Sequence, residues 1–265
     1  MKIIQPVKAD LRSSMKTIVA QIENQILAQV KGGYPSGWNR DGITAHLLKD
    51  IGEDLNGKKV LVPGNSMKIS WKLLEAGKSF ERYFAHVAIL ARITYHDGQV
   101  LEGVAFFDAV TKDPEKNTFS ELKRDHLRRM HSISPHSHLL LYDYDMITGM
   151  AFPTIPEYVV GNYPNTWNSW IPYTNAGVIP AHAAIALGIK NTGLYKIAVP
   201  FSYHLCYRIF YGLGLDFNNT ALETGKGKRA EKGVSRYLVQ LSVAHGGAEP
   251  QSDFDINREV FSESV

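Results

Sequence analysis

Apolar residues recur at intervals of three and four between residues 10 and 31, which predicts an amphipathic helix. Asp10 is expected to cap its first turn, and Gly32 with Gly33 to end it. The apolar stripe of this helix comprises Leu11, Met15, Ile18, Val19, Ile22, Ile26, Leu27 and Val30. Such a stripe can pack into the core of the protein or against a second copy in a dimer.

Shorter elements follow this helix. A second helix is predicted for residues 44–55, with Asn56 and Gly57 at its end, and a short strand for residues 59–63. The apolar residues of 66–76 fit a helix or a strand, and the pattern favours a helix.

Two apolar runs separated by Asp97-Gly98 predict a β-hairpin in which Tyr83 faces Lys112 at the open end. Asp-Gly is typical of two-residue turns of the primed types, in which the chain adopts positive φ angles. This turn would place His96 opposite Gln99 and Val87 opposite Asp108. Because both strands are apolar on both faces, we expect them in the middle of a sheet covered by helices on each side.

Asp108 is the exception in the second of these strands, since it ends the apolar run 104–107. A carboxylate buried in a covered sheet needs a partner or a metal ion. Metal-dependent nucleases use such a strand-end acid, with a lysine a few residues later, to hold a divalent cation and position a water molecule. Lys112 is the nearest lysine after Asp108. The alternative is that Asp108 only begins the turn that follows the strand.

A helix from Thr118 or Ser120 to about His131 is predicted next, and then a strand over residues 138–145. One flank of the helix is basic, with Lys123, Arg124, Arg128 and Arg129. Such a flank can be solvated or can contact phosphate groups. The order of elements predicts an α/β (α+β) fold with a mixed central sheet flanked by helices.

The second half of the chain has weaker patterns. Residues 152–180 read as a long loop rich in proline and aromatic residues, and residues 181–189 as a strand or a short helix. Strands are predicted for 194–199, 205–211 and 237–243, the last of which closes the sheet. The stretch containing Lys226, Lys228 and Arg229 is cationic and glycine-rich.

We expect the whole chain, residues 1–265, to form one domain. Residues 1–57 would be its helical region and residues 58–150 its sheet core. Residues 151–248 would supply the aromatic, proline-rich loop and the last strands, and residues 249–265 a loosely held acidic tail.

Composition limits the class of protein. A chain of 265 residues that is 44% hydrophobic can bury a full core. The net charge of +3 is modest, so any contact with nucleic acid must come from local patches. Cys206 is the one cysteine, which excludes an intramolecular disulfide and favours a reducing compartment. The sequence contains neither a signal peptide nor an apolar run of about 20 residues, so we expect a cytoplasmic protein outside the membrane.

Several of these features, taken in order, resemble the type II restriction endonucleases that cut interrupted palindromes. The likeness covers residues 81–243 and includes the strand ending in Asp108, the basic helix, the strand 138–145, Ala151-Phe-Pro-Thr-Ile-Pro, Leu194-Tyr-Lys-Ile and the basic Gly-Lys segment. This resemblance implies a PD-(D/E)xK nuclease fold, a homodimer, Mg²⁺ as cofactor and cleavage of double-stranded DNA.

The resemblance also assigns roles to single residues. Asp108 matches the second acid of the motif, and Val110 stands where the motif has its lysine, so Lys112 is the nearest substitute. Glu81 is the best match to the first acid, which would bind the metal with Asp108, and Glu75 is the next. The expected DNA-binding residues are Lys123, Arg124, Arg128, Lys226, Lys228 and Arg229.

Two other classes of protein stay open. His136 and His138 would share one face of a strand and, with Asp143 and His182, could hold a metal as in a cupin-like enzyme. The same pair, followed by three leucines, is also similar to rolling-circle nucleases. Finally, residues 152–220 resemble the loops of virion jelly rolls.

Overall fold

One mixed β-sheet runs through the residues described by the computed structural model, which are 13–62, 65–77, 80, 83–147, 150, 174–229, 231 and 233–263. Its ten strands follow the order β1-β2-β3-β9-β4-β5-β6-β7-β8, and β10 pairs with β3. The strands are β1 (Ser13–Ser14), β2 (Lys59–Val62), β3 (Asn65–Ala76), β4 (Tyr83–Thr94), β5 (Val100–Thr111), β6 (His138–Ile147), β7 (Thr174–Pro180), β8 (Val199–Pro200), β9 (Val234–His245) and β10 (Phe261–Glu263).

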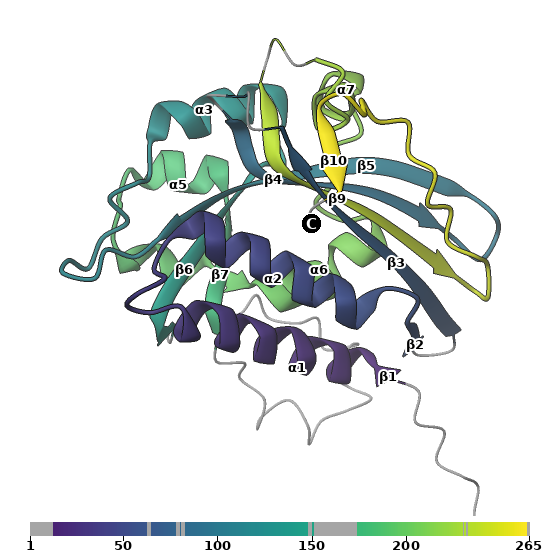
Figure 1. Cartoon of the computed structure of the whole chain (residues 1–265), viewed down its shortest axis with the longest axis horizontal. Coiled ribbons are helices and arrows are strands. Elements are labelled where there is room, and N and C mark those ends of the chain that lie inside the picture. Colours follow the sequence, from purple (N-terminus) through teal and green to yellow (C-terminus); the bar gives the residue numbers. More distant parts are fainter. Residues whose placement is uncertain are drawn as a thin grey trace, which may run out of the picture.

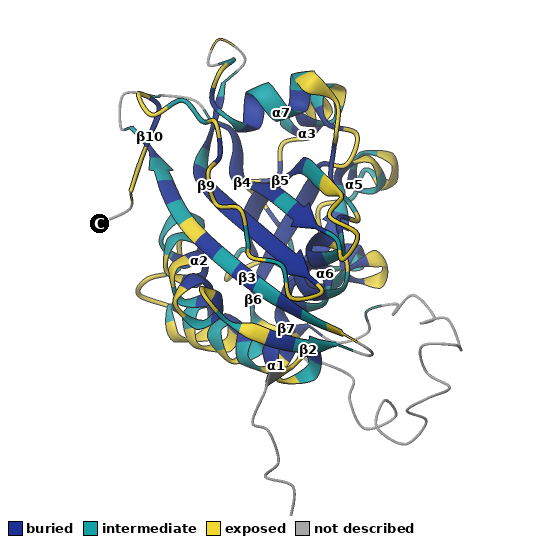
Figure 2. Cartoon of the chain, turned by 90° about the vertical axis from the view of Figure 1, so that its right-hand side faces the viewer, coloured by how far each residue is buried: buried dark blue, intermediate teal, exposed yellow. Residues whose placement is uncertain are grey.

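Helices cover both faces of this sheet (Figure 1), which confirms the predicted fold class. One face packs against α1 (Met15–Ile26), which continues as the π-helix η1 (Leu27–Lys31), and against α2 (Arg40–Leu55), α6 (Phe201–Tyr207) and the 3-10 helix η3 (Ile209–Tyr211). The other face packs against α3 (Arg124–Ile133), α5 (Ala181–Leu187), the 3-10 helix η2 (Thr192–Ile197) and α7 (Asn219–Gly225). Figure 2 shows that buried residues line the strands between these layers.

The apolar stripe of α1 belongs to the core. Its buried residues are Met15, Ile18, Val19, Ile22 and Ile26. The helix begins after Ser14, whose side chain accepts a hydrogen bond from the Thr17 amide, whereas Asp10 lies outside the described residues. The apolar stripe was expected either in the core or in a dimer contact, and the structure shows it in the core.

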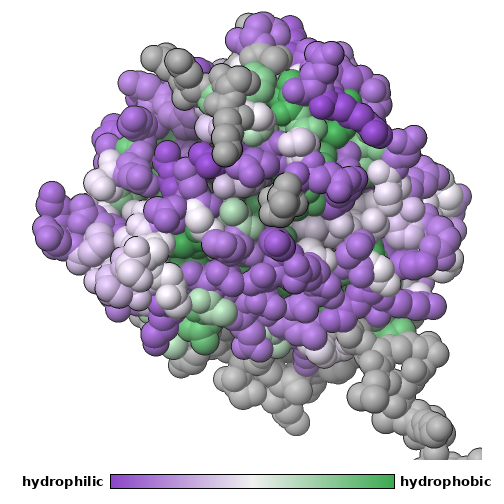
Figure 3. Space-filling model, in the orientation of Figure 1, coloured by the Kyte–Doolittle hydropathy of each residue, from purple (hydrophilic) through white to green (hydrophobic). Residues whose placement is uncertain are grey.

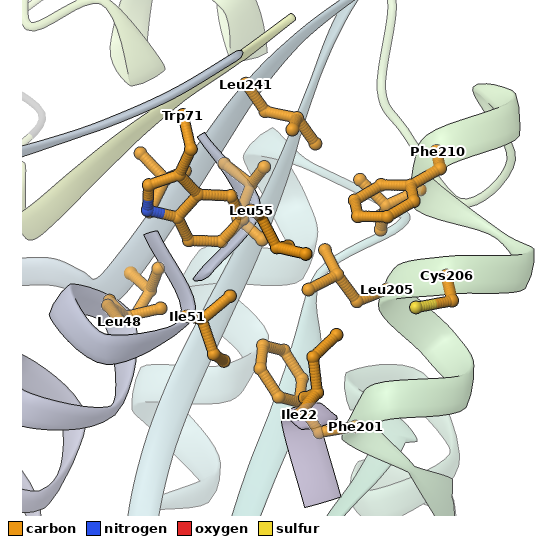
Figure 4. Close-up of a cluster of buried hydrophobic side chains, with 14 of the residues drawn as sticks. Ile22, Leu48, Ile51, Leu55, Trp71, Phe201, Leu205, Cys206, Phe210 and Leu241 are labelled. Carbon is orange, nitrogen blue, oxygen red and sulfur yellow. The ribbon is translucent and has the colours of Figure 1, made fainter. Parts of the chain in front are cut away.

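The second helix is longer than predicted. α2 begins at Arg40 because the side chain of Asn39 caps it, accepting from the Gly42 amide at 2.7 Å. In Figure 4, Leu48, Ile51 and Leu55 of α2 lie beside Trp71 of β3. A Cβ atom on Gly52 would overlap the Trp71 ring, so this glycine allows helix and sheet to approach closely.

The prediction of a helix for residues 66–76 is wrong, because this segment is β3. Met67, Ile69 and Trp71 are buried at every second position, which is the period of a strand. Residues 67–75 pair with β9, which supplies hydrogen-bond partners for their backbone N–H and C=O groups. The strand state therefore depends on a segment far along the sequence.

One of the inner strands of the sheet comes late in the sequence. The predicted strand at 237–243 exists as β9, but it does not close the sheet. It lies between β3 and β4, antiparallel to β3 and parallel to β4. All of its residues except Arg236 are buried.

Two strands predicted for the second half are wrong. Residues 192–197 form the 3-10 helix η2, and residues 201–207 form α6. Phe201 and Leu205 are both buried, at a spacing of four that suits a helix. The segment predicted as either a strand or a short helix, 181–189, is mostly the helix α5.

The rest of the second half joins the same architecture. The described residues from 174 onward form strands of the single sheet and helices that cover it, and no second sheet is present among them. The jelly-roll interpretation of that half is therefore wrong for the described residues. The segment 151–173 lies outside them.

The acidic tail is held in place. Phe254, Val260 and Phe261 are buried against the face covered by α3, α5 and α7. β10 pairs with residues 74–76 of β3. The expectation of a loosely held tail is wrong up to residue 263, where the description ends.

Candidate functional site

The β4-β5 hairpin has a three-residue loop, so the predicted two-residue primed turn is wrong. Thr94 pairs with Val100, and the Tyr95 amide donates to the Gln99 carbonyl at 2.8 Å. Gly98 has a φ of 83°, while Asp97 does not have a positive φ. A type I turn followed by a left-handed glycine accounts for this loop.

The extra loop residue shifts the strand register by one position. Val87 pairs with Phe107 and not with Asp108. A shift of one residue changes which side chains share a face of the sheet. As a result, His86 and not Val87 lies beside Asp108, and its Nδ1 atom is 2.8 Å from Asp108 Oδ1.

Asp108 is buried between two histidines. The Nε2 atom of His126 in α3 lies 3.5 Å from the same oxygen. Burial alone would raise the pKa of Asp108, but the hydrogen bonds from His126 and His86 outweigh it and hold this pKa well below its usual range. The carboxylate expected to need a partner therefore has two.

His86 links Asp108 to a second carboxylate. Its Nε2 atom lies 3.3 Å from Asp41 Oδ1, at the start of α2. Burial lowers the pKa of His86, but the bonds to Asp108 and Asp41 outweigh burial and leave this pKa raised. The hydrogen bond with His86 is the main reason that the pKa of Asp41 is lowered. Arg236 Nη1 also contacts Asp41, at 2.9 Å.

A cavity of about 440 Å³ opens above this network, and we call it the Asp108 pocket. Its lining residues are Arg40, Tyr83, Ala85, His86, Asp108, Glu121, Lys123, His126 and Arg129. The cationic side chains come from the start of α2 and from the region of α3. A cavity with this lining attracts anions, and its histidines can exchange protons.

A second hollow of about 810 Å³ adjoins the Asp108 pocket, and we call it the α3 groove. Its lining residues are Lys123, Arg124, Asp125, His126, Arg128, Arg129 and Lys190. Lys123, His126 and Arg129 line both spaces. Hydrophilic residues dominate the molecular face shown in Figure 3.

Lys112 belongs to a different cluster. Its Nζ atom donates to Asp143 at 3.1 Å and to Asp145 at 3.0 Å, and it lies over the ring of Tyr144. Tyr195 also donates to Asp143, at 2.6 Å. Lys112 is not among the lining residues of the Asp108 pocket.

The described residues provide few possible ligands for the expected Mg²⁺ ion. Glu81 lies outside the described residues, and Glu75 Oε1 is 3.9 Å from Arg236. Among the residues that the structure describes, no group of three or more His, Cys, Asp or Glu side chains could hold a metal ion. Mg²⁺ prefers several oxygen ligands in octahedral geometry. The described side chains around Asp108, which include two imidazoles, do not fit that requirement.

The predicted DNA-binding residues fall into two groups. Lys123, Arg124 and Arg128 line the α3 groove as a set. The other three are paired within the chain: Lys226 with Glu102 at 2.8 Å, Lys228 with Asp255, and Arg229 with Glu231 at 3.5 Å. In the first group Arg128 also has an acidic partner, Asp125 at 2.9 Å, but all three residues line the groove. The first group is therefore better placed to meet a ligand.

The histidines of the alternative metal site do not share a strand face. His136 lies in the turn before β6, and His138 is the first residue of that strand, which corrects the prediction that both occupy the strand. The ring centroids of His138 and His204 are 4.5 Å apart. Burial lowers the pKa of His138 to about 3, so His138 is neutral. His182 is exposed on α5, with its ring 6.0 Å from that of His131.

Most residues of the site, including the four that form or flank the Asp108 network, were not predicted from the sequence. His86 and His126 hold Asp108, while Asp41 and Arg40 come from the start of α2. The isolated histidine in the apolar run 84–91 is a usable signal for His86, because a polar residue there needs a partner inside the sheet.

Comparison with protein-family models, curated proteins and solved structures finds no match to this chain. The resemblance to restriction endonucleases therefore rests on the layout of the sequence. Within the described residues, none of the helices has both the length and the apolar character needed to cross a lipid bilayer.

Proposed function

We propose that this protein binds double-stranded DNA and hydrolyses its phosphodiester bonds in the Asp108 pocket. One observation carries the proposal: a buried carboxylate in contact with two histidines lines a cavity that is also lined by Arg40 and Lys123. Arginine and lysine bind phosphate and stabilise the negative charge that grows on it during hydrolysis.

His126 is the proposed general base. It is less deeply buried than His86, and its Nε2 atom faces Asp108. A carboxylate in that position holds an imidazole in one tautomer and stabilises the imidazolium that forms when the base takes a proton. His86 has both ring nitrogens engaged by carboxylates, so its role is to position Asp108.

The nuclease assignment also includes Mg²⁺, a homodimer and a cytoplasmic location. The described side chains around Asp108 do not form a Mg²⁺ site, so the proposed roles belong to the side chains of the protein itself. A homodimer would suit a palindromic DNA site, and since the stripe of α1 is buried, it would have to use another surface. A cytoplasmic location agrees with the single buried Cys206.

Cleavage of supercoiled plasmid by the full-length protein tests the proposal, with Mg²⁺, with Mn²⁺ and with a chelator in parallel. We expect His126→Gln and Asp108→Asn to reduce cleavage by about 100-fold or more, as for the loss of a general base. DNA binding should survive, because the cations that contact phosphate remain. His96→Gln, in the exposed hairpin loop, is the matched control. A protein that cuts no DNA under any of the three conditions would refute the proposal.

A further inference from the structure

We propose that Arg129 masks the general base His126 until a polynucleotide in the α3 groove draws the guanidinium away. The inference rests on the proposed function. It makes the enzyme selective for substrates with several phosphates, because a small phosphodiester that fills only the Asp108 pocket would leave the mask in place.

The two ring nitrogens of His126 have different neighbours. Arg129 Nη2 lies 2.9 Å from His126 Nδ1, one helical turn away on α3. A guanidinium has only donors, so Nδ1 accepts this bond with its lone pair. The ring proton is then on Nε2, facing Asp108 Oδ1 at 3.5 Å. In this state the lone pair that would take a proton from water is occupied.

Arg129 is in a position to leave His126 for an anion. Arg129 is exposed, and none of the ion pairs between described residues includes it. Its neighbour Arg128, by contrast, pairs with Asp125 at 2.9 Å. Hydrogen bonds to an anion are stronger than those to a neutral imidazole. A phosphate group in the α3 groove would therefore compete successfully with His126 for the guanidinium.

The Asp108 pocket and the α3 groove are neighbouring spaces that share lining residues. Arg129 lines both the Asp108 pocket and the α3 groove, and Arg124, Arg128 and Lys190 extend the positive charge along the groove. A polynucleotide can place one phosphate in the pocket and a neighbouring phosphate in the groove. The second phosphate supplies the anion that moves Arg129.

The reaction then balances without a further reagent. A water oxygen bonds to phosphorus while the freed His126 Nδ1 takes one of its protons. The bond from phosphorus to the leaving ester oxygen breaks, and the proton passes from the imidazolium through solvent to that oxygen. The products are a phosphomonoester and an alcohol.

Arg129→Met tests the inference, because methionine has similar length and no donor. Two substrates are compared: bis(4-nitrophenyl) phosphate, which has a single phosphate, and a DNA duplex. We expect hydrolysis of the small diester to rise about fivefold, the factor for releasing one hydrogen bond. Hydrolysis of the duplex should fall about tenfold, because a phosphate contact is lost. Arg258→Met is the control, because Arg258 is exposed and lines neither the Asp108 pocket nor the α3 groove; it should leave turnover of the small diester unchanged.

The outcomes separate the inference from the proposed function. If the unaltered protein hydrolyses neither substrate, both are overturned. If it hydrolyses them, but Arg129→Met lowers or does not change turnover of the small diester, the mask is overturned and the proposed function stands. As an independent measurement, nitrogen NMR should show the Nδ1 signal of His126 shifting when duplex is added to the unaltered protein. An unmoved signal also refutes the mask.

Discussion

At the scale of single residues, the pKa values of two carboxyl groups are shifted in opposite directions, because their partners differ. Asp108 stays ionised because two histidines donate to it. Glu23 of α1 receives a hydrogen bond from Ser202 of α6, and it takes part in none of the ion pairs within the described part of the chain. Burial raises the pKa of Glu23 to about 7, despite the lowering effect of the bonds with Ser202 and Thr174. Glu23 therefore changes its charge near neutral pH.

The Glu23 side chain should make stability depend on pH. The pKa of the Glu23 carboxyl is 4.5 in the unfolded chain and about 7 in the folded protein. Its contribution to the free energy of unfolding is therefore fully present below pH 4.5 and is lost as the pH rises through 7. We expect Glu23→Gln to remove this loss, which is at most about 3 kcal/mol. Urea denaturation from pH 5 to pH 8 measures it, and Glu53→Gln on the exposed side of α2 is the control. Equal pH dependence in parent and Glu23→Gln would contradict the assignment.

At the scale of elements, the hairpin loop decides what the strands bring together. The three-residue loop, with Gly98 in the left-handed region, places His86 beside Asp108. A two-residue loop would place Val87 there instead. The chemistry of the site thus depends on a turn at the far end of both strands.

Two glycines should respond in opposite directions to alanine. Neither Gly98 nor Gly32 would bring a Cβ within 4 Å of another atom, so only the backbone matters. With a φ of 83°, Gly98→Ala should cost about 1 to 2 kcal/mol. With a φ of −66°, Gly32→Ala should stabilise by about 0.4 to 1 kcal/mol. Thermal denaturation compares the two variants. A Gly98→Ala protein as stable as the parent would exclude the left-handed turn.

At the scale of the whole molecule, the distribution of charge matters more than its sum. The net charge is only +3. Many of the cations are paired with acids, such as Lys226 with Glu102 and Lys228 with Asp255. The α3 groove, in contrast, gathers five lysines and arginines with one aspartate. Long-range attraction of a polyanion should therefore centre on this groove.

The salt dependence of DNA binding tests this view of the surface. Each phosphate contact contributes about 0.9 to the slope of log affinity against log salt concentration. We expect Lys123→Ala with Lys190→Ala to flatten the slope by about two contacts. Lys226→Ala with Lys228→Ala should change it less, because those ammonium groups already have acidic partners. Fluorescence anisotropy with a labelled duplex gives both slopes. A larger effect of the second pair would place the DNA on the α7 side.

The sequence alone determined the features that local patterns encode. The three- and four-residue spacing identifies α1 and its apolar stripe, and the two-sided apolar runs identify β4 and β5 as covered strands. The charged flank of α3 and the isolated acid Asp108 are also visible there. In each case the property belongs to a few neighbouring residues, so it can be read without knowledge of the fold.

Only the tertiary structure decided the rest. Residues 65–76 become a strand because β9, far along the chain, supplies the hydrogen-bonding partner. His86 meets Asp108 because of one extra loop residue, and Asp41 meets His86 because α2 begins at Arg40, directly after its cap Asn39. Lys112, the nearest lysine to Asp108 in the sequence, instead pairs with two acids of β6. These contacts join residues far apart along the chain, and their geometry depends on the register and packing of whole elements, which local periodicity does not encode.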